Sequence, residues 1–150
     1  MTPFLSFAEV STFVSNGCTL FPEGTRAQPK KWEHCCVEHD LFFWAGGTRA
    51  ERDVADIGLR ECVAKTGERN IARLMYNGIR AGYRSPIRLG KQGWGNAWQG
   101  RRVPYTKLTE TETLEILQAL EQQEPEVNES FFTKFKTVLM ARLSLLLYPN

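Results

Sequence analysis

The chain lacks the features that mark several specialised protein classes. Its most apolar stretch, FFTKFKTVLMARLSLLLY, is interrupted by Lys134, Lys136 and Arg142, and it is too short and too charged to span a membrane. Neither an internal repeat nor a low-complexity tract is present, which excludes repeat and compositionally biased architectures. With 42% hydrophobic and 24% charged residues, the composition predicts one globular domain over residues 1–150.

Acidic residues are absent from one long segment. Nine Lys and Arg residues and no Asp or Glu lie between Arg69 and Lys107, although the formal net charge of the whole chain is only +2. All 17 acidic residues lie on either side of this segment. Such segregation of charge indicates an anionic partner and says little about the fold.

A secretory signal is also missing, and cysteines are few. The opening MTPFLSFAEVSTFV has neither the basic start nor the apolar length of a signal peptide, so the compartment has to be inferred from the cysteines. In a reducing compartment, the four cysteines would bind metal or stay reduced; in an oxidising one, they allow two disulfides with three pairings. Adjacent cysteines rarely bond to each other, so Cys35 and Cys36 would each pair with Cys18 or Cys62.

Turn and capping signals predict a mainly α fold. Pro29 fits the first turn of a helix, and Gly46 and Gly47 stop it. Thr48 and Glu51 form a capping-box signature for the next helix, so only two glycines separate the pair, which we expect to be antiparallel. The predicted elements are a helix or strand in residues 1–15, the paired helices near 29–45 and 48–65, a third helix with Ile71, Leu74, Met75 and Ile79 on its apolar face, a basic and aromatic loop over 82–107, and helices near 109–123 and 128–148 in a helical C-terminal part, 109–150.

The hexapeptide CCVEHD, residues 35–40, concentrates reactive side chains on the first helix of the pair. At 100° per residue its cysteines and His39 share one face, and Asp40 lies roughly 40° beyond it. On the second helix, Asp56 stands at the edge of the face that carries Cys62. If Cys62 faces the first helix, Asp56 reaches His39 and fixes the tautomer of a catalytic base. Asp40 is then left to bind a hard cation together with carbonyls of the preceding loop.

Other interpretations of these residues remain open. His39 can be a core histidine that is satisfied by a neighbour, and Asp56 can be a solvated residue on its helix. A zinc site would have one histidine and three cysteines as ligands: Cys18, Cys36, Cys62 and His39. That site would leave Cys35 and Asp40 without a role.

The hexapeptide and its surroundings resemble the secreted phospholipase A2 enzymes. CCVEHD matches their Cys-Cys-x-x-His-Asp signature, and NGCTLFPEG is similar to their calcium loop. The family also has, on its second helix, an aspartate six residues before a cysteine, as Asp56 precedes Cys62. The resemblance covers about residues 16–64 and is nearest to the compact bacterial and fungal members.

The resemblance implies calcium-dependent hydrolysis of the sn-2 ester of phospholipids. His39 would activate water, Asp56 would orient the imidazole, and Asp40 would hold calcium. The additional calcium ligands would be oxygen atoms of the loop: the carbonyls of Gly17, Thr19 and Phe21 and the side chain of Asn16.

The same resemblance implies two disulfides, Cys18–Cys36 and Cys35–Cys62, and with them a secreted or periplasmic protein. Two positions depart from the family pattern. Phe43 replaces a tyrosine that hydrogen-bonds the orienting aspartate, and Thr19 replaces a glycine of the loop.

The acid-free segment interleaves arginines with aromatic residues, and a lipase must draw its substrate from a membrane. We therefore predict that four residues contact an anionic phospholipid surface: Trp94, Trp98, Arg101 and Arg102. Alternatively, the two tryptophans cap the core from a glycine-rich loop. A second function class is a catalytically weak or inactive module on the same scaffold that binds anionic lipid or nucleic acid, of which lipid is the favoured ligand. No nucleic-acid motif accompanies the segment, and no protein partner is indicated.

Overall fold

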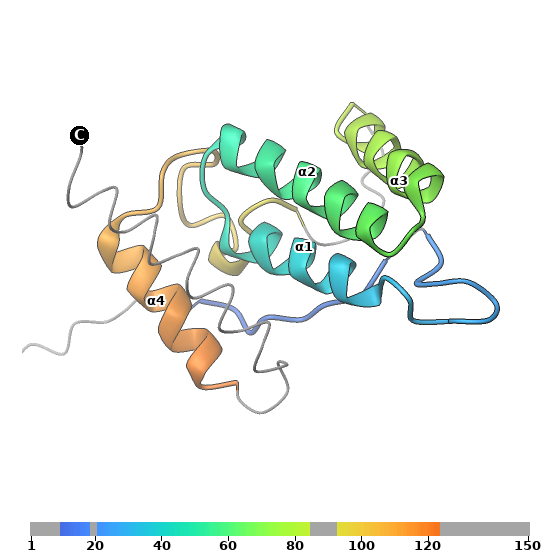
Figure 1. Cartoon of the computed structure of the whole chain (residues 1–150). Helices are drawn as coiled ribbons and strands as arrows, with labels where there is room; N and C mark the ends of the chain where they lie inside the picture. Colours follow the sequence, from blue (N-terminus) through green and yellow to red (C-terminus); the bar gives the residue numbers. More distant parts are fainter. Residues whose placement is uncertain (1–9, 19–20, 85–92, 124–150) are drawn as a thin grey trace, which may run out of the picture.

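The computed structural model describes residues 10–18, 21–84 and 93–123, which are mainly helical, as the sequence predicts (Figure 1). The elements are the helices α1 (Glu33–Ala45), α2 (Arg49–Lys65), α3 (Arg69–Gly82) and α4 (Glu110–Glu121) and the short 3₁₀ helix η1 (Asn96–Trp98). Residues 10–15 form neither a helix nor a strand, and the helix predicted over 128–148 lies outside the described residues. None of the helices described is long and apolar enough to cross a bilayer.

Helices α1 and α2 form the expected antiparallel pair (Figure 1). Gly46 and Gly47 make the turn between them with φ of 78° and 132°, values that favour glycine. The Thr48 hydroxyl then accepts a hydrogen bond from the Glu51 N–H while the Glu51 carboxylate accepts one from the Thr48 N–H, each 3.1 Å long. This capping box starts α2 at once, so the two helices lie side by side after a minimal connection.

The segment from Gly93 to Trp98 closes the C-terminal end of α1. The last carbonyls of a helix have no partner within it. Here the Gly95 N–H donates to the Phe43 carbonyl, and the Trp98 indole donates to the Ala45 carbonyl over 2.9 Å. A Cβ on Gly46 would lie 2.8 Å from Gly95 Cα, so the two backbones approach closely only because neither has a side chain there.

The described residues bury two apolar clusters on opposite sides of α1. One joins α1 to α4, η1 and the N-terminal segment, with Phe13, Leu41, Trp44, Ala45, Ala97, Trp98, Leu108, Ile116, Leu117 and Leu120. The other surrounds the disulfides between α1, α2 and α3, with Cys18, Trp32, Cys35, Cys36, Leu59, Val63, Ala72 and Met75. Helix α1 therefore holds its reactive residues against packed neighbours.

Helix α3 buries a face slightly different from the predicted one. Ala72 and Met75 are buried, and Ile71 and Ile79 pack partly against the core. Leu74 is 57% exposed, so its placement on the apolar face was wrong. Ala72 lies on the same helix face as Met75 and Ile79, and its small side chain lets α3 approach α2 closely.

Candidate active site

His39 and Asp56 meet between α1 and α2. His39 Nε2 lies 2.8 Å from Asp56 Oδ1, and the side chains are 10% and 0% exposed. Since a carboxylate only accepts hydrogen bonds, the proton of a neutral imidazole sits on Nε2. The lone pair then lies on Nδ1, where it can take a proton from water.

Two further side chains contact Asp56: Arg80 of α3 and Tyr83, the residue that follows α3. The Tyr83 hydroxyl lies 2.9 Å from Oδ1 and 2.8 Å from Oδ2 of Asp56 and donates to the carboxylate. Arg80 Nη1 donates to Asp56 Oδ2 over 3.2 Å and also to Asp53. Asp56 is thus a fully buried carboxylate with three partners, which is the arrangement that a buried charge requires.

Electrostatics keep these partners in their donor forms. Burial, and then the negative charge of Asp56, raise the pKa of the Tyr83 phenol well above its usual value. The hydrogen bonds of Arg80 to Asp53 and to Asp56 raise the pKa of its guanidinium. Both groups therefore remain protonated and able to donate to Asp56.

Sequence reasoning missed Tyr83 and Arg80. Phe43, at the position where the phospholipase A2 pattern has a tyrosine, has no hydroxyl, and Tyr83, the residue that follows α3, supplies one instead. The Phe43 ring stacks on that of Tyr83 with centroids 6.3 Å apart and lies 4.5 Å from the His39 ring. Phe43 therefore fills the space between the tyrosine and the imidazole.

Asp40 faces the loop that precedes α1. Its Oδ2 accepts a hydrogen bond of 2.7 Å from the Ser15 hydroxyl, and the Asn16 backbone donates to it as well. The Ser15 oxygen also accepts from the Gly17 N–H, and Gly17 has a φ of 64° that turns the loop around the carboxylate. Burial raises the pKa of Asp40 above its usual value near 3.8, while the hydrogen bond from Ser15 lowers it in part.

This neighbourhood offers oxygen donors, which suit a hard cation such as calcium. They are the Asp40 carboxylate and the Ser15 hydroxyl. Of the predicted loop ligands, Asn16, Gly17 and Phe21 are described, and Thr19 lies outside the described residues. A cation beside the partly buried Asp40 would offset the cost of desolvating its negative charge.

Both implied disulfides are formed. Cys18 is bonded to Cys36, and Cys35 to Cys62, so that the part of the chain described holds no free cysteine. The first bond ties the loop to α1 and the second ties α2 to α1, beside the His39–Asp56 contact. A zinc site is therefore wrong for this structure, because disulfide sulfurs offer no thiolate ligands.

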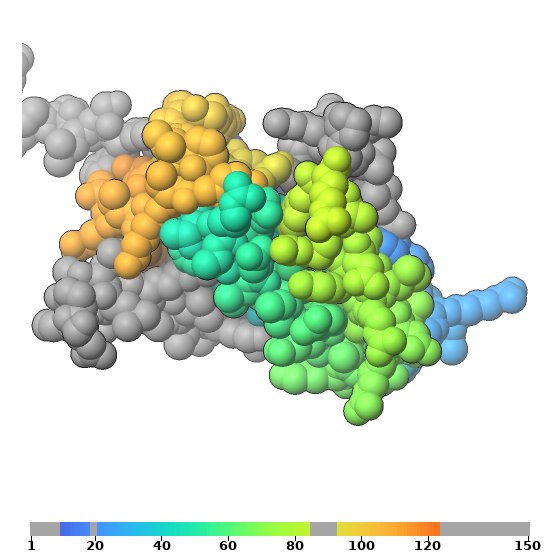
Figure 2. Space-filling model, turned by 90° about the horizontal axis from the view of Figure 1, so that it is seen from above, coloured from blue at the N-terminus to red at the C-terminus, as the bar shows by residue number. Residues whose placement is uncertain are grey.

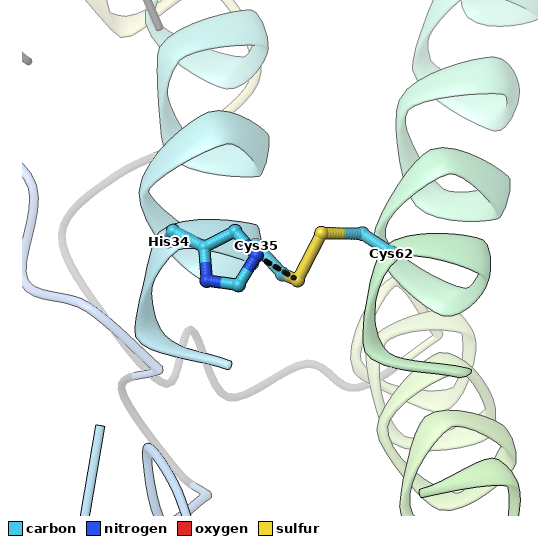
Figure 3. Close-up of side chains that lie close together, drawn as sticks. All are labelled: His34, Cys35 and Cys62. Carbon is cyan, nitrogen blue, oxygen red and sulfur yellow. Dashed lines mark hydrogen bonds between the residues drawn. A yellow bond between two sulfur atoms is a disulfide. The ribbon is translucent and has the colours of Figure 1, made fainter. Parts of the chain in front are cut away.

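The described residues contain one cluster of at least three potential His, Cys, Asp or Glu metal ligands, and it lies apart from Asp40. His34, Cys35 and Cys62 bring three donor atoms within 4.8 Å of one another (Figure 3). Both sulfurs belong to the disulfide, and His34 Nε2 lies 3.5 Å from the Cys35 sulfur. With the disulfide intact, the group has one free nitrogen donor and does not resemble a calcium site.

A cavity of about 190 Å³ opens beside His39 between α1 and α2. Its lining is mostly apolar and comes from both helices: Cys35, Glu38, His39, Phe42, Val54, Ala55, Gly58 and Leu59. No sequence pattern predicts this cavity, because it arises where the small residues Ala55 and Gly58 leave space on α2. It places an apolar surface directly next to the imidazole.

The predicted lipid-contact residues do not form one exposed surface. Trp98 is 3% exposed and belongs to the core, so its prediction as a lipid contact is wrong; the interpretation as a core-capping tryptophan applies. Trp94 is half-buried and donates from its indole to the Gly47 carbonyl. Arg102 binds Glu112 through two nitrogens, and Arg101 is exposed. An acidic partner from α4 thus neutralises part of the basic segment.

The chain matches no known protein family, no curated protein and no solved structure. The resemblance to phospholipase A2 therefore rests on the motif residues of the sequence.

Proposed function

We propose that the protein is a calcium-dependent hydrolase of the phospholipase A2 type, which cleaves the sn-2 ester of phospholipids. The observation that supports this best is the 2.8 Å contact of His39 Nε2 with the buried Asp56, with Asp40 next in the chain and facing the loop. A core histidine would need only one neighbour. The network of Tyr83 and Arg80 around Asp56 fits a base that must stay oriented while it takes up a proton.

Each residue then has a distinct task. Asp56 accepts a hydrogen bond from the Nε2–H of His39 and stabilises the imidazolium that forms when Nδ1 removes a proton from water. The apolar cavity beside His39 would accommodate part of an acyl chain. Asp40 and the carbonyls of Gly17 and Phe21 would hold calcium, which when bound supplies positive charge for the substrate phosphate and for the oxyanion.

Two disulfides are compatible with an extracytoplasmic protein, and we propose secretion or periplasmic export as its location. A phospholipid membrane would be the source of the substrate in either place.

The test is release of fatty acid from diacyl phospholipid micelles, with calcium or with a chelator. We expect His39→Gln to lower the rate by at least about 100-fold, because a general base contributes typically 10²–10⁴-fold. Asp40→Asn should lose activity that excess calcium partly restores. His34→Gln is the matched control, since His34 is an exposed histidine on the same helix.

Absence of chelator-sensitive hydrolysis by the pure wild-type protein would refute the proposal. Retained binding to anionic vesicles without turnover would then favour the non-catalytic lipid-binding module.

A further inference from the structure

Arg52 is a buried arginine for which the described residues provide no acidic hydrogen-bond partner. It is 7% exposed, and its Nη1 donates to the Tyr105 hydroxyl over 2.6 Å. Its Nε is buried and makes no hydrogen bond. In the described ranges, no Asp or Glu forms an ion pair with it. A buried guanidinium normally has a carboxylate or phosphate partner, so this side chain has hydrogen-bonding capacity that the protein leaves unused.

The position of Arg52 in α2 adds to the excess of positive charge. Arg49 and Arg52 both lie in the first turn, where free backbone N–H groups and the helix dipole already create positive potential. The first-turn acid, Glu51, is engaged in the capping box with Thr48. Two arginines at this end oppose the dipole, and a bound anion would relieve that conflict.

Aromatic rings surround the two guanidinium groups. Arg52 lies 3.9 Å from the centroid of Tyr83, and Arg49 lies 4.4 Å from that of Tyr105. Tyr105 has a φ of 59°, a left-handed conformation that is uncommon outside glycine and is kept only where surrounding contacts enforce it. Its hydroxyl accepts from Arg52, which leaves the phenolic proton available for an acceptor.

Charged side chains of both signs cluster around the two guanidinium groups. Three arginines and two aspartates lie close together: Arg49, Arg52, Arg80, Asp53 and Asp56. The carboxylate of Glu51, in the same turn of α2, is a further negative charge and is engaged in the capping box. Figure 2 shows the first half of α2 between α3 and the yellow-to-orange segment, which contains Tyr105, and Arg49 is exposed to solvent there.

We propose that Arg49, Arg52 and Tyr105 form a binding site for a phosphate-class anion at the start of α2. The planar guanidinium group suits phosphate oxygens. The site shares no residue with the loop around Asp40. Tyr83, which contacts both Arg52 and Asp56, connects it to the His39–Asp56 pair. The anion is the head group of a phospholipid or a free phosphate ion, which have this chemistry in common.

The first test is calorimetric titration with inorganic phosphate in the absence of calcium. We expect saturable binding by the wild type, and a Kd at least about tenfold higher for Arg49→Gln and Arg52→Lys, because a hydrogen bond to a charged group is worth about one such factor or more. Tyr105→Phe removes one donor and should also weaken binding. Arg60→Gln, the same change further along α2, should bind as the wild type does.

The proposal would be overturned if the wild type showed no saturable phosphate binding. It would also be overturned if Arg49→Gln and Tyr105→Phe bound phosphate with the Kd of the wild type. Those two variants decide the outcome even if Arg52→Lys does not fold, because Arg49 is exposed and Tyr105 keeps its ring.

Vesicles identify the source of the phosphate. Loss of binding to phosphatidylglycerol vesicles by Arg49→Gln, with competition by inorganic phosphate, supports the site and assigns it to a lipid head group. Unchanged vesicle binding by Arg49→Gln, with weaker phosphate binding, supports the site and assigns it to the free ion. Both measurements can be made on His39→Gln without calcium, so they do not depend on hydrolysis.

Discussion

Replacing Tyr83 with Phe tests whether the hydroxyl holds the buried Asp56. The substitution keeps the ring that contacts Arg52 and Phe43 and removes only the donor to the carboxylate. A hydrogen bond to a charged group contributes about 1.5–3 kcal/mol. Since Asp56 keeps His39 and Arg80 as partners, we expect a loss of about 2 kcal/mol in the free energy of unfolding. For a chain of this size that lowers the Tm by about 4–8 °C.

Urea unfolding followed by circular dichroism, with the disulfides intact, measures this loss. Tyr76→Phe is the control on the same helix, because Tyr76 presents its ring face to Arg60 at 4.7 Å. In an Asp56→Asn background the effect of Tyr83→Phe should fall sharply, since the charged acceptor is gone. A Tyr83→Phe variant within about 0.5 kcal/mol of Tyr76→Phe, or an undiminished effect in the Asp56→Asn background, would refute the assignment.

Three further predictions concern stability. Changing Cys35 and Cys62 together to Ala should cost about 3.5 kcal/mol in urea unfolding under non-reducing conditions, because the bond closes a loop with a sequence separation of 27; an unchanged midpoint would contradict this. Trp98→Ala should cost about 3–5 kcal/mol, measured in the same way, and a value near zero would restore the idea of a surface tryptophan. Burial raises the pKa of Glu112, but its hydrogen bonds with Arg102 and Thr109 have the larger combined effect, so its pKa lies below the usual 4.5. Because the pKa of Glu112 is lower in the folded state, its ionised carboxylate stabilises the fold above about pH 4.5, and this stabilisation is lost as the pH falls below that value. Glu112→Gln should therefore flatten the pH dependence of the free energy of unfolding in the acid range. A pH profile identical to that of the wild type would contradict this prediction.

The helices could be predicted from the sequence because their signals are local. Thr48 and Thr109 each begin a helix with a glutamate three residues later, and both capping boxes are formed. The contact of His39 with Asp56 followed from one further condition, that Cys62 faces α1. Once two helices are antiparallel and crosslinked, the helical period fixes which side chains meet.

The rest depended on contacts between distant parts of the chain. Tyr83 reaches Asp56 across 27 positions, and only the packing of α3 against α2 determines that it does so. Trp98 was expected at a membrane because a tryptophan in a Gly-rich, basic loop has no periodicity from which burial can be inferred. Trp98 is buried instead, because its indole N–H donates to the Ala45 carbonyl, which has no partner within α1.

The adjacent cysteines make correct oxidative folding a condition for the candidate active site. The exchanged pairing, Cys18 with Cys35 and Cys36 with Cys62, would close loops just one residue shorter than the native ones, so chain entropy barely distinguishes the two isomers. Successive residues on a helix differ by about 100° in direction. Bringing Cys36 to α2 would therefore rotate α1 and turn His39 away from Asp56. A preparation with the correct mass and no free thiol can consist of either isomer, and only disulfide mapping tells the competent molecules from the scrambled ones.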